Sequence, residues 1–209
     1  MSSRQRHLAI AVCLLLAGVV VWLDKGSGGR RLRHAITRQW PRNDTEKYHR
    51  NSFKVTYIVD GDTLHIDIAD GKYDHTRVRL LGIDTPETKQ GKQQAMYYAA
   101  EATDFATQLA LNKEVTVILD DKSPPRDKYN RLLAHLELKD GQTVNDLLVR
   151  NGFAYADLRF DNDRFDRYVA LQNEAKRARK GLWKGVKKDQ LPKWLQRERP
   201  DILDPPSGR

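Results

Sequence analysis

The stretch "VDGDTLHIDI", residues 59–68, joins a tight turn to an alternating β-strand. Asp60 and Gly61 stand between two runs of β-prone residues, and an Asp-Gly pair in that setting is the strongest local signal of a β-hairpin. The apolar residues that follow alternate with polar ones, so the strand has one buried face. The turn does not explain Asp62, which follows it and is therefore a candidate for a metal-ligating role.

Similar patterns recur along the chain and alternate with helical ones. Strands are expected at 53–59, 63–68, 76–83, 114–120 and 131–138, and helices at 91–111, 143–152 and 163–180. Gly152 and Gly181 suit the C-terminal ends of the last two helices. Five short strands with a helix after the third match an α+β fold, a small five-stranded OB-type β-barrel with about three helices.

Charge is unevenly distributed over the 209 residues. The whole chain carries a net charge of +9, but +6 of this belongs to the first 38 residues. Basic composition is therefore weak support for nucleic-acid binding by the folded part. Cys13 is the single cysteine, which excludes an intramolecular disulfide, and the six histidines have no metal-ligand spacing, so we interpret them as ordinary surface or strand residues.

The N-terminus holds a run of 16 uncharged residues, "LAIAVCLLLAGVVVWL", after two arginines. Trp22 suits a membrane interface and no cleavage site follows, so residues 1–24 are predicted to form an uncleaved signal anchor, with cleavage and secretion as the alternative. The positive-inside rule alone would keep the domain in the cytoplasm, because the downstream flank is the more basic one. We nevertheless expect an extracytoplasmic domain, against the charge count.

The remaining boundaries follow from composition. Residues 25–50 are interpreted as a basic flexible linker, 51–186 as the barrel domain and 187–209 as a Pro-rich charged tail, in which Trp194 is a candidate docking residue.

Four short segments contain the residue types that metal-assisted phosphodiester hydrolysis requires, although each alone has an ordinary structural explanation. They are "DGDT" (60–63), "RVRLLGIDTPE" (77–87), "RDKYNR" (126–131) and "VNDLLVRNG" (144–152). Carboxylates and a carbonyl suit a hard cation such as Ca²⁺, and a further carboxylate can orient or deprotonate water. Arginines can neutralise charge that develops on phosphate oxygens.

These strings, together with "EAKRARKGLW" at 174–183, resemble the staphylococcal nuclease-like (thermonuclease) family in order and spacing over about residues 53–183. The resemblance implies an OB-fold barrel and Ca²⁺-dependent hydrolysis of DNA and RNA to 3′-phosphate products. Single-stranded or unpaired regions would be the preferred substrate. We expect a monomer and infer no protein partner. A weak Ca²⁺ site would fill outside the cytoplasm, where the ion is abundant, which is why we expect an extracytoplasmic domain.

The resemblance also assigns roles by position. Asp62 and Asp84 would be carboxylate ligands of Ca²⁺, and Thr85 would offer its backbone carbonyl. Glu87 would hold or deprotonate the attacking water, a role that is argued over within the family.

Four further positions would bind the substrate. Arg79 and Arg131 would contact the scissile phosphate and its transition state, and Lys128 and Tyr129 a terminal phosphate. The chain departs from the family where a tyrosine stacks on the base, because ungapped counting places Leu158 there. Tyr155 and Phe160 are the nearby aromatic residues, and either is a candidate for the stacking role.

Two other interpretations remain open. The first is a noncatalytic OB-type module that binds nucleic acid or peptide, against which the joint presence of both arginines, both aspartates and the glutamate argues. The second makes the basic end of the last helix, residues 176–180, the main nucleic-acid surface. Cations near a helix C-terminus are favoured by the helix dipole and by solvent in any protein, so we interpret these residues as a solvated face.

Overall fold

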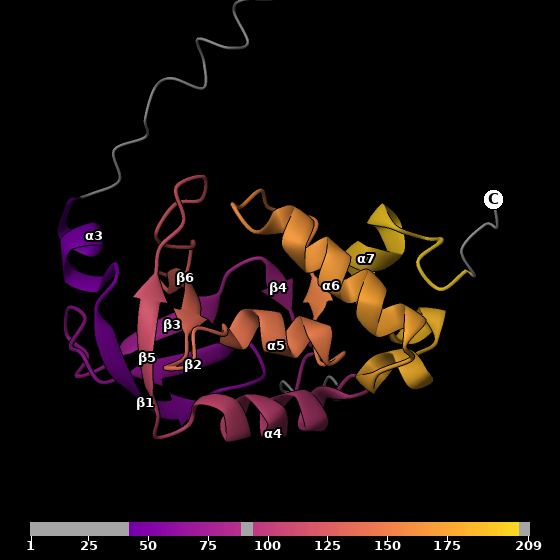
Figure 1. Ribbon diagram of the computed structural model, residues 1–209, viewed down its shortest axis with the longest axis horizontal. Coiled ribbons are helices and arrows are strands. Elements are labelled where there is room, and N and C mark those ends of the chain that lie inside the picture. Colours follow the sequence, from indigo (N-terminus) through magenta and orange to yellow (C-terminus); the bar gives the residue numbers. More distant parts are fainter. Residues whose placement is uncertain (1–41, 89–93, 205–209) are drawn as a thin grey trace, which may run out of the picture. The chain divides into compact units, whose positions relative to one another are not determined.

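The computed structural model describes residues 42–88 and 94–204, which contain the predicted barrel (Figure 1). Five strands close in the order β1-β2-β3-β6-β5, and all neighbours are antiparallel except β3 and β6. Their bounds are β1 Ser52–Ile58, β2 Thr63–Ile66, β3 Thr76–Leu80, β5 Glu114–Ile118 and β6 Leu132–Glu137. The α+β barrel predicted from the sequence is confirmed.

Along the strands, buried apolar side chains alternate with side chains that point away from the core. Leu64 and Ile66 are buried, whereas His65 between them is partly exposed. In β3, Val78 and Leu80 point inward and Arg79 between them points outward. The inward residues of all five strands meet in one cluster, so the polar outward side chains of β2 and β3 share the opposite face.

Three helices pack around the barrel: α4 Ala99–Ala110, α5 Val144–Arg150 and α6 Phe165–Arg177. Figure 1 shows α5 between the strands and α6, and it packs against β6, α4 and α6. The helix predicted from residue 91 begins only at Ala99, because Tyr98 has a φ of 71°. Gly152 ends α5 as predicted, with a φ of +74°, and an added Cβ there would lie 2.4 Å from the Lys180 carbonyl oxygen.

The N-terminal boundary of the domain lies earlier than predicted. Helix α3, Arg42–Tyr48, precedes β1, and Tyr48 is fully buried in the core. Arg126 binds Asp44 of α3 through Nε at 2.8 Å and Asp70 through Nη1 at 2.6 Å. Residues 42–50 therefore belong to the folded domain and not to a linker.

The predicted membrane anchor and most of the predicted linker lie outside the residues that the structure describes. Within the described ranges, no helix is long and apolar enough to cross a membrane.

The C-terminal region is folded where a tail was expected. Two short 3₁₀ helices, Gly181–Lys184 and Lys188–Gln190, lead to helix α7, Lys193–Glu198. Trp194 is buried, as expected of a docking residue. Apolar side chains there form a second cluster with the two-residue strand β7: Tyr155, Ala175, Leu182, Trp183, Leu191, Trp194, Leu195 and Ile202. The apolar residues between the charges were too sparse to predict this packing.

A two-stranded sheet links the two clusters. Strand β4, Ile83–Asp84, pairs antiparallel with β7, Tyr155–Ala156, and Asp84 lies opposite Tyr155. The candidate ligand Asp84 therefore sits at the junction between the barrel and the C-terminal region.

The buried His135 of β6 predicts how the stability of the fold depends on pH. Its ring is 2% exposed and lies between the Tyr168 hydroxyl at 2.6 Å and Asp120 Oδ2 at 3.3 Å. Burial lowers the pKa of His135, although Asp120 opposes the shift. The unfolded chain therefore takes up this proton at higher pH than the folded chain. The neutral His135 ring therefore contributes its full stabilisation above the ordinary histidine pKa of about 6.5, and this stabilisation is lost as the pH falls below that value.

Urea unfolding from pH 7.5 to pH 5 measures this effect against a His135→Gln variant. The wild type should lose up to about 1.4 kcal/mol per pH unit relative to the variant, the limit for one proton. The comparison cancels other titrating groups. Parallel pH profiles for the two proteins would contradict the assignment.

Candidate active site

Asp62 is held directly after the hairpin turn by contacts to a residue far along the chain. Its Oδ2 accepts hydrogen bonds from the Thr85 backbone nitrogen at 2.8 Å and from Thr85 Oγ1 at 3.0 Å. Thr85 also explains Gly61, because a Cβ on that glycine would lie 2.8 Å from Thr85 Cγ2. The sequence attributed Gly61 to the turn alone, whereas the close approach of Thr85 also requires it.

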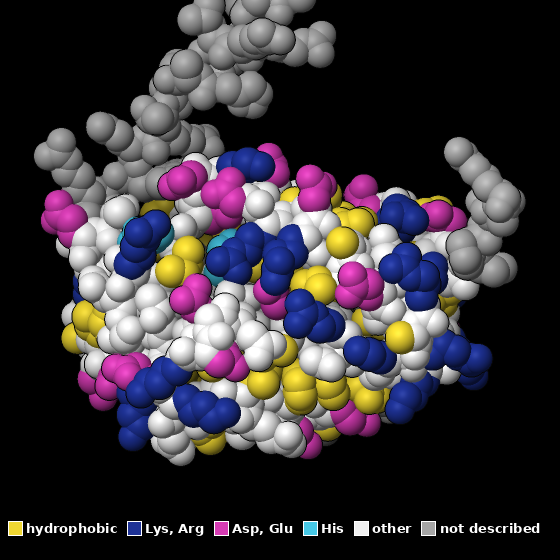
Figure 2. All heavy atoms as spheres, in the orientation of Figure 1, with side chains coloured by type: hydrophobic (Ala, Val, Ile, Leu, Met, Phe, Trp, Pro, Cys, Tyr) yellow, Lys and Arg dark blue, Asp and Glu magenta, His cyan; other side chains and the backbone are white. Residues whose placement is uncertain are grey.

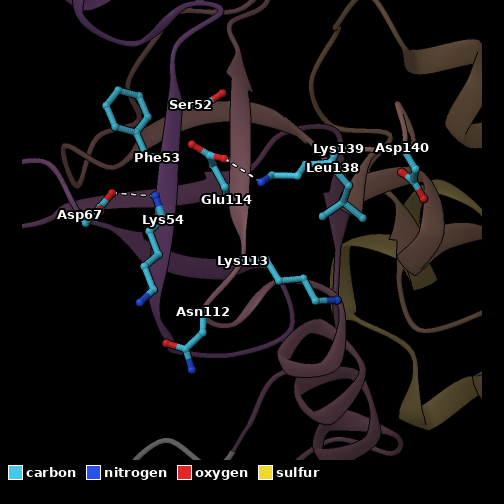
Figure 3. A pocket seen from close by; sticks show the side chains of 10 residues that line it. All are labelled: Ser52, Phe53, Lys54, Asp67, Asn112, Lys113, Glu114, Leu138, Lys139 and Asp140. Atoms are coloured by element: carbon cyan, nitrogen blue, oxygen red, sulfur yellow. Dashed lines mark hydrogen bonds and ion pairs between the residues drawn. The ribbon is translucent and has the colours of Figure 1, made fainter.

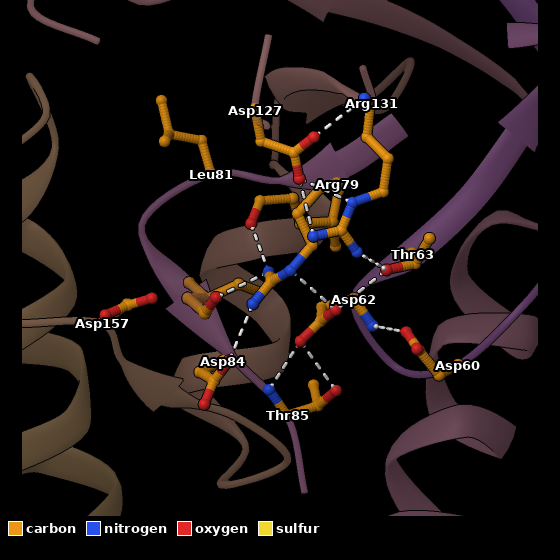
Figure 4. A network of polar contacts seen from close by, with 12 residues as sticks. Asp60, Asp62, Thr63, Arg79, Leu81, Asp84, Thr85, Asp127, Arg131 and Asp157 are labelled. Carbon is orange, nitrogen blue, oxygen red and sulfur yellow. Dashed lines mark hydrogen bonds and ion pairs between the residues drawn. The ribbon is translucent and has the colours of Figure 1, made fainter. Parts of the chain in front are cut away.

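Arg79 connects the two candidate metal ligands (Figure 4). Its Nε lies 3.1 Å from Asp62 Oδ1, and its Nη2 lies 2.8 Å from Asp84 Oδ1. Nη1 donates to the backbone carbonyls of Leu80 and Ile83, each at 2.7 Å. With a side chain only 12% exposed, Arg79 neutralises both carboxylates inside the protein.

Acidic groups are crowded around this arginine. Burial, with the charge of Asp62, raises the pKa of Asp60 to about 6. Burial also raises the pKa of Asp84 to about 6, against the opposing effect of Arg79. Asp60 Oδ1 accepts from the Asp62 backbone nitrogen at 3.0 Å, the contact expected of a turn aspartate. Negative charge is therefore disfavoured here unless a cation compensates it.

Arg131, the second arginine predicted to contact the phosphate, lies at the end of the loop before β6. Arg131 is held by Asp127, with Nε and Nη2 each 2.7 Å from Asp127 Oδ2, and its Nη1 lies 3.3 Å from Thr63 Oγ1. Thr63 Oγ1 in turn donates to Asp62 Oδ1 at 3.2 Å. The structure thus brings Arg131, Thr63, Asp62 and Arg79 into one network.

Lys128 and Tyr129 lie in the same loop as Arg131. The Tyr129 ring is 60% exposed, the Lys128 Nζ lies 4.9 Å from its centroid, and the Arg131 guanidinium carbon lies 5.6 Å from it. Both side chains are therefore on the open side of the network.

Glu87 lies three residues beyond Asp84 and is exposed. Partial desolvation and the charge of Asp62 raise the pKa of Glu87, and the charges of Arg79 and Arg131 oppose the shift. All the predicted metal and catalytic residues are therefore in one region of the structure.

Comparison with known proteins agrees with this arrangement. The family described as "Staphylococcal nuclease homologue" matches residues 77–185, more than half of the chain. This chain belongs to the staphylococcal nuclease family.

The regions aligned with individual relatives include most of each relative's length. An "Uncharacterized endonuclease" of Escherichia coli O157:H7 is 35% identical over 146 residues, which is 70% of this chain and 84% of that protein. The "Thermonuclease" of Staphylococcus intermedius is 35% identical over 133 residues, or 63% of this chain and 76% of that protein. The "Thermonuclease" of Staphylococcus hyicus is 31% identical over 136 residues, which is 65% of this chain and 77% of that protein.

The two aromatic residues near the stacking position of the family differ sharply in exposure. Tyr155 is fully buried in β7, so it is not placed to stack on a base. Phe160 is 58% exposed, and the guanidinium carbon of Arg159 lies 5.5 Å from its ring centroid. Phe160 is the remaining candidate of the two.

Two contacts to Asp84 were not predicted from the staphylococcal nuclease pattern. Arg159 Nη2 lies 3.2 Å from Asp84 Oδ1 and 2.7 Å from Asp157 Oδ2. Trp194 Nε1 donates to Asp84 Oδ2 at 2.7 Å, and its ring faces the Arg159 guanidinium at 4.6 Å. No motif marks Arg159, and Trp194 lies 110 residues from Asp84, so only the folded C-terminal region reveals these contacts.

Replacing Trp194 by phenylalanine should therefore destabilise the protein beyond its loss of volume. The change removes a buried donor to a carboxylate, which costs about 1.5–3 kcal/mol. Trp183→Phe is the matched control, because Trp183 lies in the same cluster and its buried Nε1 has no hydrogen-bond partner among the described residues. Urea unfolding of both variants measures the difference, and equal losses would contradict a contribution from the Trp194 hydrogen bond.

A surface hollow elsewhere shares none of these residues (Figure 3). Its three lysines are balanced by three acids, and Lys139 Nζ lies 3.0 Å from Glu114 Oε2. It offers no excess charge for an anionic substrate.

Proposed function

We propose that this protein is a nuclease that hydrolyses phosphodiester bonds of DNA and RNA with the help of Ca²⁺. One observation carries the proposal: Arg79, Arg131 and the two aspartates belong to a single network around Asp62. Membership of the staphylococcal nuclease family supports it, and relatives named thermonuclease and endonuclease point to the same reaction.

The donor chemistry fits a hard cation. Asp62, Asp84 and the Thr85 carbonyl offer only oxygen atoms, which Ca²⁺ prefers. Burial, and to a lesser extent the charge of Asp62, raises the pKa of Asp84, and a bound cation would favour its ionised form. Within the described ranges, no group of three or more His, Cys, Asp or Glu side chains could hold a metal ion. Water would therefore complete the coordination.

Binding of a cation should rearrange Asp62. A carboxylate has about four acceptor positions. Asp62 receives donors from Thr85 twice, from Thr63 and from Arg79. A cation on Asp62 would therefore replace one of these donors. If Arg79 is released, its guanidinium becomes available to phosphate.

The chain's own residues divide the chemistry between them. Arg79 and Arg131 would bind the phosphate and stabilise the charge that develops on its oxygens. Glu87 would orient a water and take its proton as the oxygen–phosphorus bond forms, and the bond from phosphorus to the 5′-oxygen breaks as that oxygen takes a proton from solvent water. The bound Ca²⁺ would supply charge stabilisation as a Lewis acid. The products are a 3′-phosphate and a 5′-hydroxyl.

Lys128, Tyr129 and Phe160 are proposed to hold the substrate on either side of that bond. Lys128 and Tyr129 would contact a terminal phosphate, and the exposed Phe160 ring would stack on a base. Acidic and basic side chains are interspersed on the face shown in Figure 2. On this face the basic side chains do not form a single broad surface.

Degradation of single-stranded DNA and RNA oligonucleotides by the purified protein tests the proposal. Fragments should accumulate with wild-type protein and far more slowly with Asp62→Asn. Oligonucleotide binding without cleavage by wild-type protein would instead favour the noncatalytic module.

We further propose a monomer anchored in the membrane by residues 1–24, with the domain facing out of the cytoplasm. The uncharged run of 16 residues supports the anchor. Protease added to intact cells should digest the domain. Protection until the cells are opened would support the cytoplasmic orientation, and recovery from the medium would support cleavage and secretion.

A further inference from the structure

A row of aromatic side chains lies on the outward face of β1 and β2 and on the connection between β2 and β3. It consists of Tyr57, His65, His75 and Tyr73, called here the aromatic row. Tyr57 is 58% exposed and Tyr73 is 47% exposed. The rings of His65 and His75 stack at 4.1 Å with an interplanar angle of 13°, and Tyr57 lies 5.3 Å from His65.

Strand register places this row beside the candidate active site. Thr63 of β2 lies opposite Arg79 of β3, and His65 lies opposite Arg77. Residues two apart on a strand share a face, at about 7 Å spacing. His65 and Arg77 therefore lie one step along the sheet from Thr63 and Arg79. Tyr57, opposite His65, extends the same row onto β1.

Cationic side chains accompany the rings. The guanidinium carbon of Arg77 lies 5.8 Å from the Tyr73 ring centroid, and Lys72 Nζ lies 5.3 Å from it. Arg77 Nη2 also donates to the Tyr129 carbonyl oxygen at 3.0 Å, which connects the row to the loop that carries Lys128. Asp74 lies beside the row and contacts His75 Nδ1 at 2.7 Å.

Exposed rings alternating with cations are the features that bind single-stranded nucleic acid. Bases stack on aromatic side chains whatever their sequence, and the cations follow the phosphates. These rings do not belong to the hydrophobic core, because the core is formed by the inward side chains of the same strands. Rings with Lys72 and Arg77 beside them, next to Arg79 on the same sheet, suit a polynucleotide, because its bases can stack on the rings while its phosphates contact the cations.

We propose that the aromatic row binds the single-stranded part of the polynucleotide that extends beyond the scissile phosphate. The inference rests on the proposed function for its position, but binding to the row is measurable without cleavage. It predicts that oligonucleotides long enough to reach the row bind more tightly than dinucleotides, and that the difference depends on Tyr57 and Tyr73.

The test is fluorescence anisotropy in EDTA with labelled single-stranded oligonucleotides of two and twelve nucleotides. Tyr57→Ala and Tyr73→Ala together should weaken binding of the longer one about tenfold or more, the effect of losing a stacked base, and leave the shorter one unchanged. Tyr57→Phe with Tyr73→Phe keeps the rings and should restore wild-type binding.

Cleavage assays with Ca²⁺ separate the two proposals. The alanine variant should show a raised KM for the long substrate with kcat unchanged. If wild-type protein fails to cleave but its binding depends on the two rings, the proposed function fails and the row remains a binding surface. Unchanged binding of the long oligonucleotide by the alanine variant would overturn the inference, whatever the outcome for cleavage.

Discussion

Replacing Arg79 by lysine is expected to lower the rate of phosphodiester cleavage by about 10²–10³, the loss typical of one preorganised charged donor. Lysine keeps the positive charge but cannot reproduce the planar fork, which here contacts Asp62, Asp84 and two carbonyl groups at once. Gel-based cleavage rates at saturating substrate measure the effect, and circular dichroism establishes that the variant is folded.

The matched control for this change is Arg167→Lys. Arg167 also makes a two-pronged contact with a carboxylate, Asp146, at 2.6 Å and 2.9 Å, but it lies on α6 and outside the network around Asp62. Its replacement should leave the cleavage rate unchanged. Equal rates for wild type and a folded Arg79→Lys variant would show that Arg79 has only a structural role.

Replacing Glu87 by glutamine is expected to lower the cleavage rate by about 10²–10⁴, the usual contribution of a general base. Glutamine retains the shape of the side chain, so binding of an uncleaved oligonucleotide should be nearly unchanged. Single-turnover kinetics and anisotropy measure the two quantities separately on the same variant.

Glu101→Gln is the control, because Glu101 is an exposed glutamate in the first turn of α4. It should cleave at the wild-type rate. A Glu87→Gln variant that lost binding and rate in the same proportion would contradict a role in activating water and would assign Glu87 to substrate binding.

The sequence was sufficient to predict the barrel because its strands alternate strongly. Leu64 and Ile66 bracket His65, and the buried and exposed sides follow directly from that pattern. The candidate site residues on or beside β2, β3 and β4 were proposed for a different reason, because four motifs occur together in the order and spacing of the staphylococcal nuclease family. The structure then brings Asp62 to Thr85, although 23 residues separate them.

The C-terminal contacts were not predictable by the same means. Trp194 lies in a charged, Pro-containing segment whose few apolar residues have no clear period, and it contacts Asp84 across 110 residues. Arg159 likewise becomes informative only when β7 pairs with β4. The turn at Gly61 was predicted from the sequence. The close approach of the Thr85 side chain, which also requires glycine there, becomes apparent only in the folded structure.

The most direct test of the central claim is the cleavage of single-stranded DNA by the purified protein in Ca²⁺, in EDTA, and in EDTA followed by excess Ca²⁺, with the product ends identified by mass spectrometry. The proposed function predicts cleavage in Ca²⁺, none in EDTA, recovery when Ca²⁺ is restored, and fragments that end in 3′-phosphate. Cleavage that persists in EDTA, or fragments that carry 5′-phosphate, would contradict it.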